Sequence, residues 1–211
     1  MKKFLMAAIF FVMVSVTNFA NAAEIDRAFY LGTPDVSYPL VIAKNADATA
    51  KINREIRNEV KKLIEAVNKQ MAEGDFNSVV IGIDYEIPCN HENGILSIIL
   101  NQYVNFENSA HPSSYRRGLS FNSDSGARLT AESLSEIAKH GNDYTPEILT
   151  QKLRAYSEKN NGLLFSDFQR LTKTPDDFYF DDNLHVHFLF QQYEVAPYAV
   201  GIIDLDADAT Y

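Results

Sequence analysis

The chain has 211 residues, 46% of them hydrophobic, and its 28 acidic side chains outnumber 19 basic ones, which gives a net charge of −9. We expect no nucleic-acid partner, because nucleic-acid binding depends on basic side chains that release counterions from phosphate; the charge favours basic partners, although solubility alone would also explain it. A single cysteine excludes an internal disulfide, so the stability has to come from an apolar core.

The N-terminal segment has the pattern of a signal peptide. Two lysines precede an uncharged, mainly apolar run from Phe4 to Val16, and Ala20-Asn21-Ala22 supplies the small residues that signal peptidase requires. We therefore expect residues 1–22 to be a signal peptide, cleaved after Ala22, and the protein to be periplasmic or secreted, without a membrane anchor. The alternative is an uncleaved anchor, but the apolar run is shorter than the roughly 20 residues of a spanning helix. The mature domain, residues 23–211, would carry a charge of 17 − 28 = −11, because both lysines are removed.

The first part of the mature chain predicts a strand and a long helix. Tyr38–Ile42 has the composition of a short strand. After it, apolar residues recur at helical spacing, with Asn45 or Asp47 placed to cap the start of the helix and Gly74 placed to end it. The apolar positions of this helix are Ile52, Ile56, Val60, Leu63, Ile64, Val67 and Met71.

The apolar period then changes to two, which is typical of strands. The alternation from Val79 to Ile87 and from Leu96 to Leu100 predicts a hairpin, with Asn93-Gly94 in a longer polar loop. A third strand is expected from Tyr115 to Phe121, and the polar turn Asn122–Gly126 ends it. This half of the chain therefore predicts one helix against an antiparallel sheet.

Two helical segments are expected next. The shorter begins near Thr130 and carries Leu134 and Ile137. The longer opens at Thr145-Pro146-Glu147, where the threonine is placed to cap the helix and the proline takes its first position. Its apolar stripe comprises Ile148, Leu149, Leu153 and Tyr156.

A second hairpin and a final strand complete the chain. Phe178-Tyr179-Phe180 and Leu184 to Phe190 flank the turn Asp181–Asn183, and the last strand is expected from about Ala199 to Leu205. No Pro/Gly-rich linker, repeat or low-complexity stretch divides these elements. We therefore expect an α+β fold with a single domain over residues 23–211, in which helices pack on one face of a mostly antiparallel sheet.

Two segments of the chain resemble a known family of extracytoplasmic domains. The first is Ala110-His111-Pro112 followed by Tyr115–Asn122, and the second is Gln192–Gly201. They are similar to the C-terminal domain of unknown function in the lysozyme receptor and anti-sigma factor RsiV, which also occurs in the peptidoglycan deacetylase PdaC. The similarity covers nearly the whole mature chain, since Tyr38-Pro39 before a helix with Ile52-Asn53 also resembles the segment that precedes this domain.

The resemblance implies a binding module of the bacterial cell envelope, because in RsiV this domain is the part that binds lysozyme. The sequence contains neither the sigma-binding segment and membrane span of RsiV nor the deacetylase domain of PdaC, so those activities are not expected. We expect a non-enzymatic module that recognises lysozyme or another basic envelope-active protein. Two alternatives stay open, namely a peptidoglycan- or glycan-binding domain and an envelope hydrolase.

Five residues of these two segments are candidates for binding, namely His111, Tyr115, Tyr193, Glu194 and Tyr198. A carboxylate between tyrosines at a proline-bent corner has the groups to bind a cation or a sugar, since tyrosine offers an apolar face and a hydroxyl. Structural roles are the alternative. A histidine before proline is held in extended geometry and suits entry into a strand, and Glu194 suits local hydrogen bonds that hold the corner.

Metal and catalytic sites are not expected. His185 and His187 would point to the same face of a strand, and Cys89 lies near His91 in the expected loop, but nothing supplies the four ligands of a structural zinc site. The tail Asp204–Asp208 lacks the glycine and the glutamate of a calcium loop and is expected to be a solvated acidic end. No nucleophile elbow, zinc-protease helix, phosphate loop or dinucleotide fingerprint occurs, so no cofactor is expected.

Overall fold

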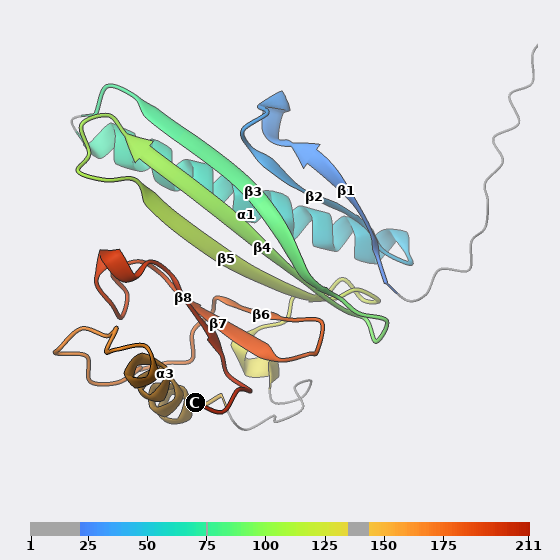
Figure 1. Cartoon of the computed structure of the whole chain (residues 1–211). Coiled ribbons are helices and arrows are strands. Elements are labelled where there is room, and N and C mark those ends of the chain that lie inside the picture. Colours follow the sequence, from blue (N-terminus) through green and yellow to red (C-terminus); the bar gives the residue numbers. More distant parts are fainter. Residues whose placement is uncertain (1–21, 75, 135–143) are drawn as a thin grey trace, which may run out of the picture.

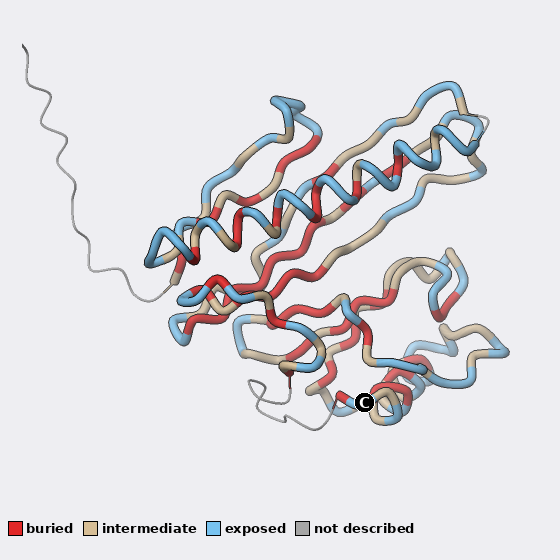
Figure 2. Tube along the Cα trace, turned by 180° about the vertical axis from the view of Figure 1, so that it is seen from behind, coloured by how far each residue is buried: buried red, intermediate tan, exposed pale blue. Residues whose placement is uncertain are grey.

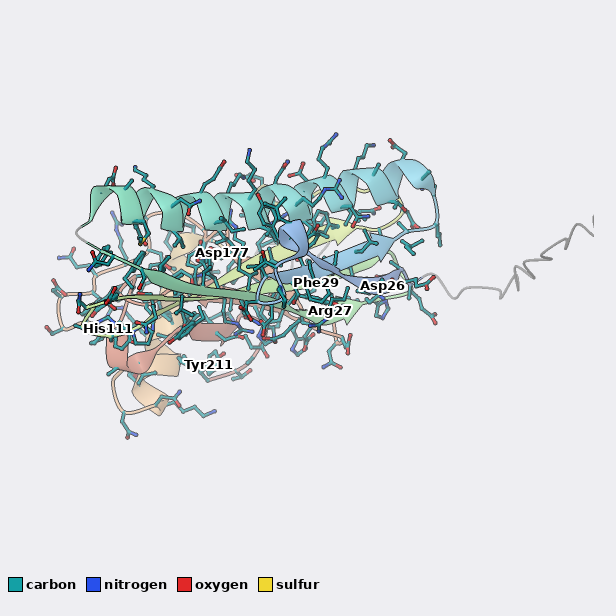
Figure 3. The ribbon with its side chains drawn as sticks, turned by 90° about the horizontal axis from the view of Figure 1, so that it is seen from above. Asp26, Arg27, Phe29, His111, Asp177 and Tyr211 are labelled. Carbon is teal, nitrogen blue, oxygen red and sulfur yellow. The ribbon has the colours of Figure 1, made fainter. Side chains whose placement is uncertain are left out.

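The computed structural model describes residues 22–74, 76–134 and 144–211. The expected signal peptide lies outside the described residues except for Ala22, and so does the expected helix after Thr130 beyond Leu134. Among the described residues, eight strands form three antiparallel sheets. Helix α1, the central sheet, the C-terminal sheet and helix α3 follow one another as layers (Figure 1, Figure 3). Within this part of the chain, no helix has the length and apolar character needed to cross a membrane.

The first layer is helix α1, which spans Ala46–Glu73. The side chain of Asn45 caps it by accepting a hydrogen bond from the backbone N–H of Ala48 at 2.8 Å, and Gly74 follows its last turn. Its outer face is exposed, whereas its inner stripe is buried against the central sheet (Figure 2). The predicted helix is confirmed, and its main buried apolar residues are Ile52, Ile56, Val60, Leu63 and Val67.

A hairpin lies beside this helix. Strand β1, Glu24–Phe29, pairs antiparallel with strand β2, Ser37–Ile42. The buried side chain of Asn53 on α1 pairs with both backbone groups of Val41, accepting from its N–H at 2.9 Å and donating to its carbonyl at 2.7 Å. The predicted strand β2 is confirmed; β1 was not predicted, because most of its residues are polar or exposed.

The central sheet has the order β3-β4-β5, with β3 at Val79–Asn90, β4 at Ile95–Phe106 and β5 at Ser113–Asn122. These three strands confirm the predicted hairpin and third strand. Side chains alternate between the two faces of a strand, and both faces of β4 are covered. Towards α1 it contributes Leu96, Ile98 and Leu100, and towards the C-terminal sheet it contributes Ile99.

The C-terminal unit has its own core. Strands β6 (Phe178–Phe180), β7 (Val186–Phe190) and β8 (Ile203–Asp206) form one sheet, and α3 (Pro146–Lys159) packs on it. Thr145 caps α3 by accepting a hydrogen bond from the N–H of Ile148 at 3.3 Å, as the sequence predicts. The large buried side chains of this core are Leu149, Leu153, Phe178, Phe180, Phe188 and Phe190.

The two larger sheets approach each other closely at one point. A Cβ atom on Gly118 of β5 would collide with the backbone of Phe178, so this position requires glycine because of the contact between strands. Nearby, the hydroxyls of Ser97 and Ser120 lie 2.8 Å apart, and the N–H of Phe180 donates to the Ser97 hydroxyl at 2.9 Å. The buried serines therefore satisfy a backbone group of the neighbouring sheet.

The α+β class and the mostly antiparallel pairing are confirmed, but the arrangement differs from the expectation in two respects. The strands form three sheets, and α1 and α3 cover different sheets from opposite sides (Figure 1). The last strand begins at Ile203, because Tyr198–Val200 forms a 3-10 turn and Gly201 follows with a φ of 78°. After Thr130, the described residues contain a 3-10 turn at Ala131–Ser133.

Candidate functional site

The two segments that resemble the family meet at the free edge of β5. The N–H of Ser114 donates to Gln192 Oε1 at 2.9 Å, and the N–H of Arg116 donates to Gln191 Oε1 at 3.0 Å. The amide of Gln191 donates back to the carbonyl of Arg116 at 2.8 Å. Glutamine side chains therefore satisfy backbone groups that an exposed strand edge would leave free to pair with another chain. Segments about 80 residues apart in sequence thus form one structural unit.

Three of the five candidate residues lie together in what we call the aromatic patch, which consists of His111, Tyr193 and Tyr198. The rings of His111 and Tyr198 stack with centroids 3.7 Å apart, and His111 Nε2 lies 3.2 Å from the Tyr193 hydroxyl. The Tyr198 hydroxyl donates to the carbonyl of Pro112 at 2.7 Å. Figure 3 shows His111 at the end of the molecule remote from Phe29 of β1.

Tyr193 is the exposed member of the aromatic patch. Its accessibility is 57%, and its φ of 65° lies in the left-handed region, which is costly for a residue with a large side chain. Its ring centroid lies 5.7 Å from that of Tyr198 and 6.2 Å from that of His111. Two neighbouring rings therefore hold an exposed tyrosine in a defined orientation.

The other two candidates, Tyr115 and Glu194, lie outside the patch and line a separate hollow of about 220 Å³. The Tyr115 hydroxyl donates to Asp177 Oδ2 at 3.1 Å; burial and the charge of Asp177 raise the pKa of Tyr115 to about 12. Glu194 Oε2 accepts a hydrogen bond from the N–H of Gln191 at 2.8 Å. This is the local bond expected in the structural alternative for Glu194.

A buried ionic cluster, the helix-side network, lies between α1 and β5 and consists of Glu59, Arg117, Arg128 and Asp177. Arg117 bridges the two carboxylates, at 3.3 Å from Glu59 and 3.1 Å from Asp177. Arg128 donates to the carbonyl of Gly118 at 2.7 Å; burial and the charge of Arg117 lower its pKa to about 10. Asp177 lies towards α1 in Figure 3. The cluster fixes β5 to the helix and to the segment before β6.

A second cluster, the sheet-side network, lies on the opposite face of β5 and consists of Glu86, Arg116, Tyr179, His187 and Asp204. Asp204 is its centre, because it accepts hydrogen bonds from Arg116 at 3.1 Å, Tyr179 at 2.8 Å and His187 Nδ1 at 3.0 Å. Arg116 also lies 3.3 Å from Glu86. The rings of Tyr179 and His187 stack with centroids 4.7 Å apart. The network joins the central sheet to all three C-terminal strands.

The groups of the sheet-side network shift one another's pKa. Burial opposes the charged form of Asp204, but hydrogen bonds from His187 and Tyr179 outweigh it, so the pKa of Asp204 lies below its ordinary value. Burial also opposes the imidazolium of His187, but the bond to Asp204 and its charge raise the pKa of His187 above 6.5. Burial and Asp204 raise the pKa of Tyr179, which keeps the phenol protonated.

Among the described residues, no group of three or more histidine, cysteine or acidic side chains is arranged to hold a metal ion. His185 and His187 contact different carboxylates, Asp206 at 3.3 Å and Asp204 at 3.0 Å. Cys89 belongs to β3 rather than to the loop and is buried, which raises the pKa of its thiol to about 12.

The acidic tail is not the solvated end that the sequence predicts. The carboxylate of Asp208 accepts hydrogen bonds from the Tyr144 hydroxyl at 2.8 Å and from the N–H of Val186 at 2.9 Å. Asp206 accepts from the N–H of Asp208 at 2.9 Å, and its carbonyl accepts from the Tyr211 hydroxyl at 2.9 Å. These residues therefore hold the end of β8 against Tyr144 and β7, in addition to bonds within the tail.

Comparison with known proteins agrees with this organisation. Residues 130–206 match the family described as Protein of unknown function (DUF3298). The chain is similar to this family over that segment. DUF3298 is the domain found in RsiV and PdaC, so the predicted resemblance is confirmed. The match includes the whole second signature segment, Gln192–Gly201, and begins after the first.

The likeness to a solved structure extends beyond the DUF3298 segment. The crystal structure of a DUF3298 family protein from Pseudomonas aeruginosa PAO1 matches 88% of this chain and 88% of its own chain, with a TM-score of 0.55 and 14% identity. At this identity the match shows the fold alone. No curated protein matches the chain.

Sequence reasoning missed the sheet-side network and most of the helix-side network. Asp204 and His187 lie 17 residues apart, and Arg116 lies 88 residues from Asp204, so no local spacing connects them. The available signal was the pair Arg116-Arg117 in a predicted strand, because adjacent strand residues point to opposite faces. A buried arginine needs a carboxylate partner. If both arginines are buried, carboxylates must therefore lie on both faces of the sheet.

Proposed function

We propose that this protein is an extracytoplasmic binding module of the cell envelope that recognises a basic protein such as lysozyme. The exposed ring of Tyr193, held by His111 and Tyr198 where the two signature segments meet, is the observation that carries the proposal. Tyrosine contributes a large contact area with little loss of conformational entropy, and it is enriched at protein interfaces. The net charge of −9 supports a basic partner, because it favours electrostatic approach.

Calorimetric titration with a C-type lysozyme, at low and at moderate salt, tests the proposal. The protein is purified in its secreted form, with the N-terminus that the cell produces. Tyr193→Ala is compared with the wild type. We expect binding at both salt concentrations and a loss of about tenfold in affinity for the variant, as for a moderate interface hot spot. Leu31→Ala is the matched control, because Leu31 is 88% exposed on the β1–β2 hairpin.

Two results would overturn the proposal. Binding that disappears at moderate salt would reveal only attraction between opposite net charges. If the wild type and Tyr193→Ala bind lysozyme with equal affinity, the aromatic patch is not part of the interface. Cosedimentation with purified peptidoglycan, in the absence of lysozyme binding, would favour the glycan-binding alternative.

A further inference from the structure

A hollow of about 360 Å³ lies on the face of the central sheet that meets the C-terminal sheet. Ile99 and Tyr103 of β4 point to this same face. Ile99 is buried under the C-terminal sheet with 1% accessibility, whereas Tyr103 is 43% exposed. The C-terminal sheet therefore covers Ile99 but does not reach Tyr103. The hollow lies on the part of the central sheet that the C-terminal sheet leaves uncovered.

Tyr103 stands between two small residues. The strand register places it opposite Gly82 of β3 on one side and opposite Ser114 of β5 on the other. Neither neighbour has a side chain long enough to cover the tyrosine ring. The aromatic ring is consequently accessible from within the hollow, which all three residues line.

Two acidic residues, Asp35 and Asp84, line the same hollow, and both are exposed. The carbonyl of Asp35 accepts a hydrogen bond from the N–H of Ile83 at 2.8 Å, which fixes residue 35 beside β3. Over the described ranges of the chain, neither carboxylate forms an ion pair or a side-chain hydrogen bond. Arg116 also lines the hollow, but Glu86 and Asp204 already pair with its charge.

We infer that this hollow accepts a lysine or arginine side chain of the partner, an inference that rests on the proposed recognition of a basic protein. A cation is attracted to the face of an aromatic ring, and the two unpaired carboxylates supply the opposite charge. Ser114 links the hollow to the segment of the aromatic patch, because it lines the hollow and donates its N–H to Gln192, the residue before Tyr193. One partner surface would therefore contact both.

A small probe tests the hollow without lysozyme. Backbone amide shifts of the protein are followed by NMR during titration with Nα-acetyl-arginine amide, and Nα-acetyl-citrulline amide serves as the neutral probe of nearly the same shape. We expect saturable shifts at Gly82 and Tyr103 with the arginine probe and none with the citrulline probe. Equal shifts with both probes, or shifts spread over all exposed acidic residues, would overturn the inference.

Two variants separate the shape of the hollow from its charge. Gly82→Val fills it without changing the charge; a Cβ at this position meets only the Asp35 carbonyl, at an ordinary 3.8 Å, and φ is not positive. We expect Gly82→Val to weaken arginine binding about tenfold and Asp84→Asn about threefold, the range of an exposed ion pair. Asp167→Asn removes one charge from an exposed residue outside the hollow and should leave the affinity unchanged.

The same variants, titrated with lysozyme, distinguish failure of this inference from failure of the proposed function. If the wild type binds lysozyme and Gly82→Val binds equally well, the hollow is not a contact, although the proposed function stands. If lysozyme does not bind but the arginine probe saturates the hollow, the cation site stands and its partner is another basic protein. Binding of chitotriose at Tyr103, without binding of the arginine probe, would overturn the inference in favour of a saccharide site.

Discussion

Arg116 and Arg117 are neighbours in sequence, yet they belong to two different ionic clusters on opposite faces of β5. Arg117 bridges Glu59 and Asp177, whose side chains are only 11% and 12% exposed. Arg116 bridges Glu86 and Asp204, whose side chains are 54% and 30% exposed. Both arginines pair with two carboxylates, but only the carboxylates of the helix-side network are almost fully removed from water. The burial of the partners, rather than the number of ion pairs, should decide what each arginine contributes to stability.

The largest effect is expected for Arg117→Met. This change leaves the carboxylates of Glu59 and Asp177 buried without their common cation. Glu59 keeps the exposed Lys62 at 2.7 Å, and Asp177 keeps hydrogen bonds from Tyr115 and Gly118. We therefore expect a loss of about 3 kcal/mol in the free energy of unfolding, the low end for a broken buried ion pair. Urea denaturation followed by circular dichroism measures the loss. A loss below about 1 kcal/mol would contradict the assignment of Arg117 to a buried network.

Gly118→Ala should have the next largest effect, because Gly118 lies at the closest approach of the two sheets that the networks join. The added Cβ would collide with the backbone of Phe178, so β5 and β6 would have to separate. We expect a loss of roughly 1–3 kcal/mol in the free energy of unfolding, measured in the same way. Gly82→Ala, which has ordinary contacts, is the control and should change stability far less.

Arg116→Met should cost less than Arg117→Met. Asp204 keeps its hydrogen bonds from Tyr179 and His187, and Glu86 is half-exposed to water. We expect a loss of roughly 1 kcal/mol in the unfolding free energy. Equal losses for the two arginine variants would remove the proposed distinction between the two networks.

The smallest effect is a dependence on pH between about pH 5.5 and 8.5, which we expect from His187 of the sheet-side network, because the helix-side network contains no histidine. The pKa of His187 in the folded state lies above its ordinary 6.5. Its contribution to stability is therefore fully present below pH 6.5 and is lost as the pH rises through the folded-state pKa.

Comparison of the wild type with His187→Gln at several pH values tests this dependence. The wild type should exceed the variant in unfolding free energy by more at pH 5.5 than at pH 8.5, with a difference below about 1.5 kcal/mol. His91→Gln, a change in the β3–β4 loop, controls for the removal of a histidine elsewhere. If the difference in unfolding free energy between wild type and His187→Gln grows with increasing pH, the prediction is wrong.

Local patterns predicted most elements of the fold. The stripe from Ile52 to Met71 predicted α1 with a cap at Asn45 or Asp47, of which the structure uses Asn45, and Thr145-Pro146 predicted the start of α3. Strand β1 and the late start of β8 were not predicted. In β1 the apolar alternation is absent, and before β8 the chain makes a 3-10 turn that no apolar pattern indicates.

The candidate site was predictable only in part. The family resemblance indicated His111, Tyr193 and Tyr198, which the fold brings together. Tyr115 and Glu194 came from the same segments, but their side chains turn to other neighbours, Asp177 and the backbone of Gln191.

The sequence by itself determined the α+β class, the long helix, the two main hairpins and the resemblance to the DUF3298 domain, because periodicity, caps and short motifs are local properties. Tertiary structure alone decided that the strands divide into three sheets and that Arg116 and Arg117 serve opposite networks. It also decided that Tyr103 faces Gly82. These features depend on strand register and on contacts between residues far apart in the chain, which are fixed only when the layers pack.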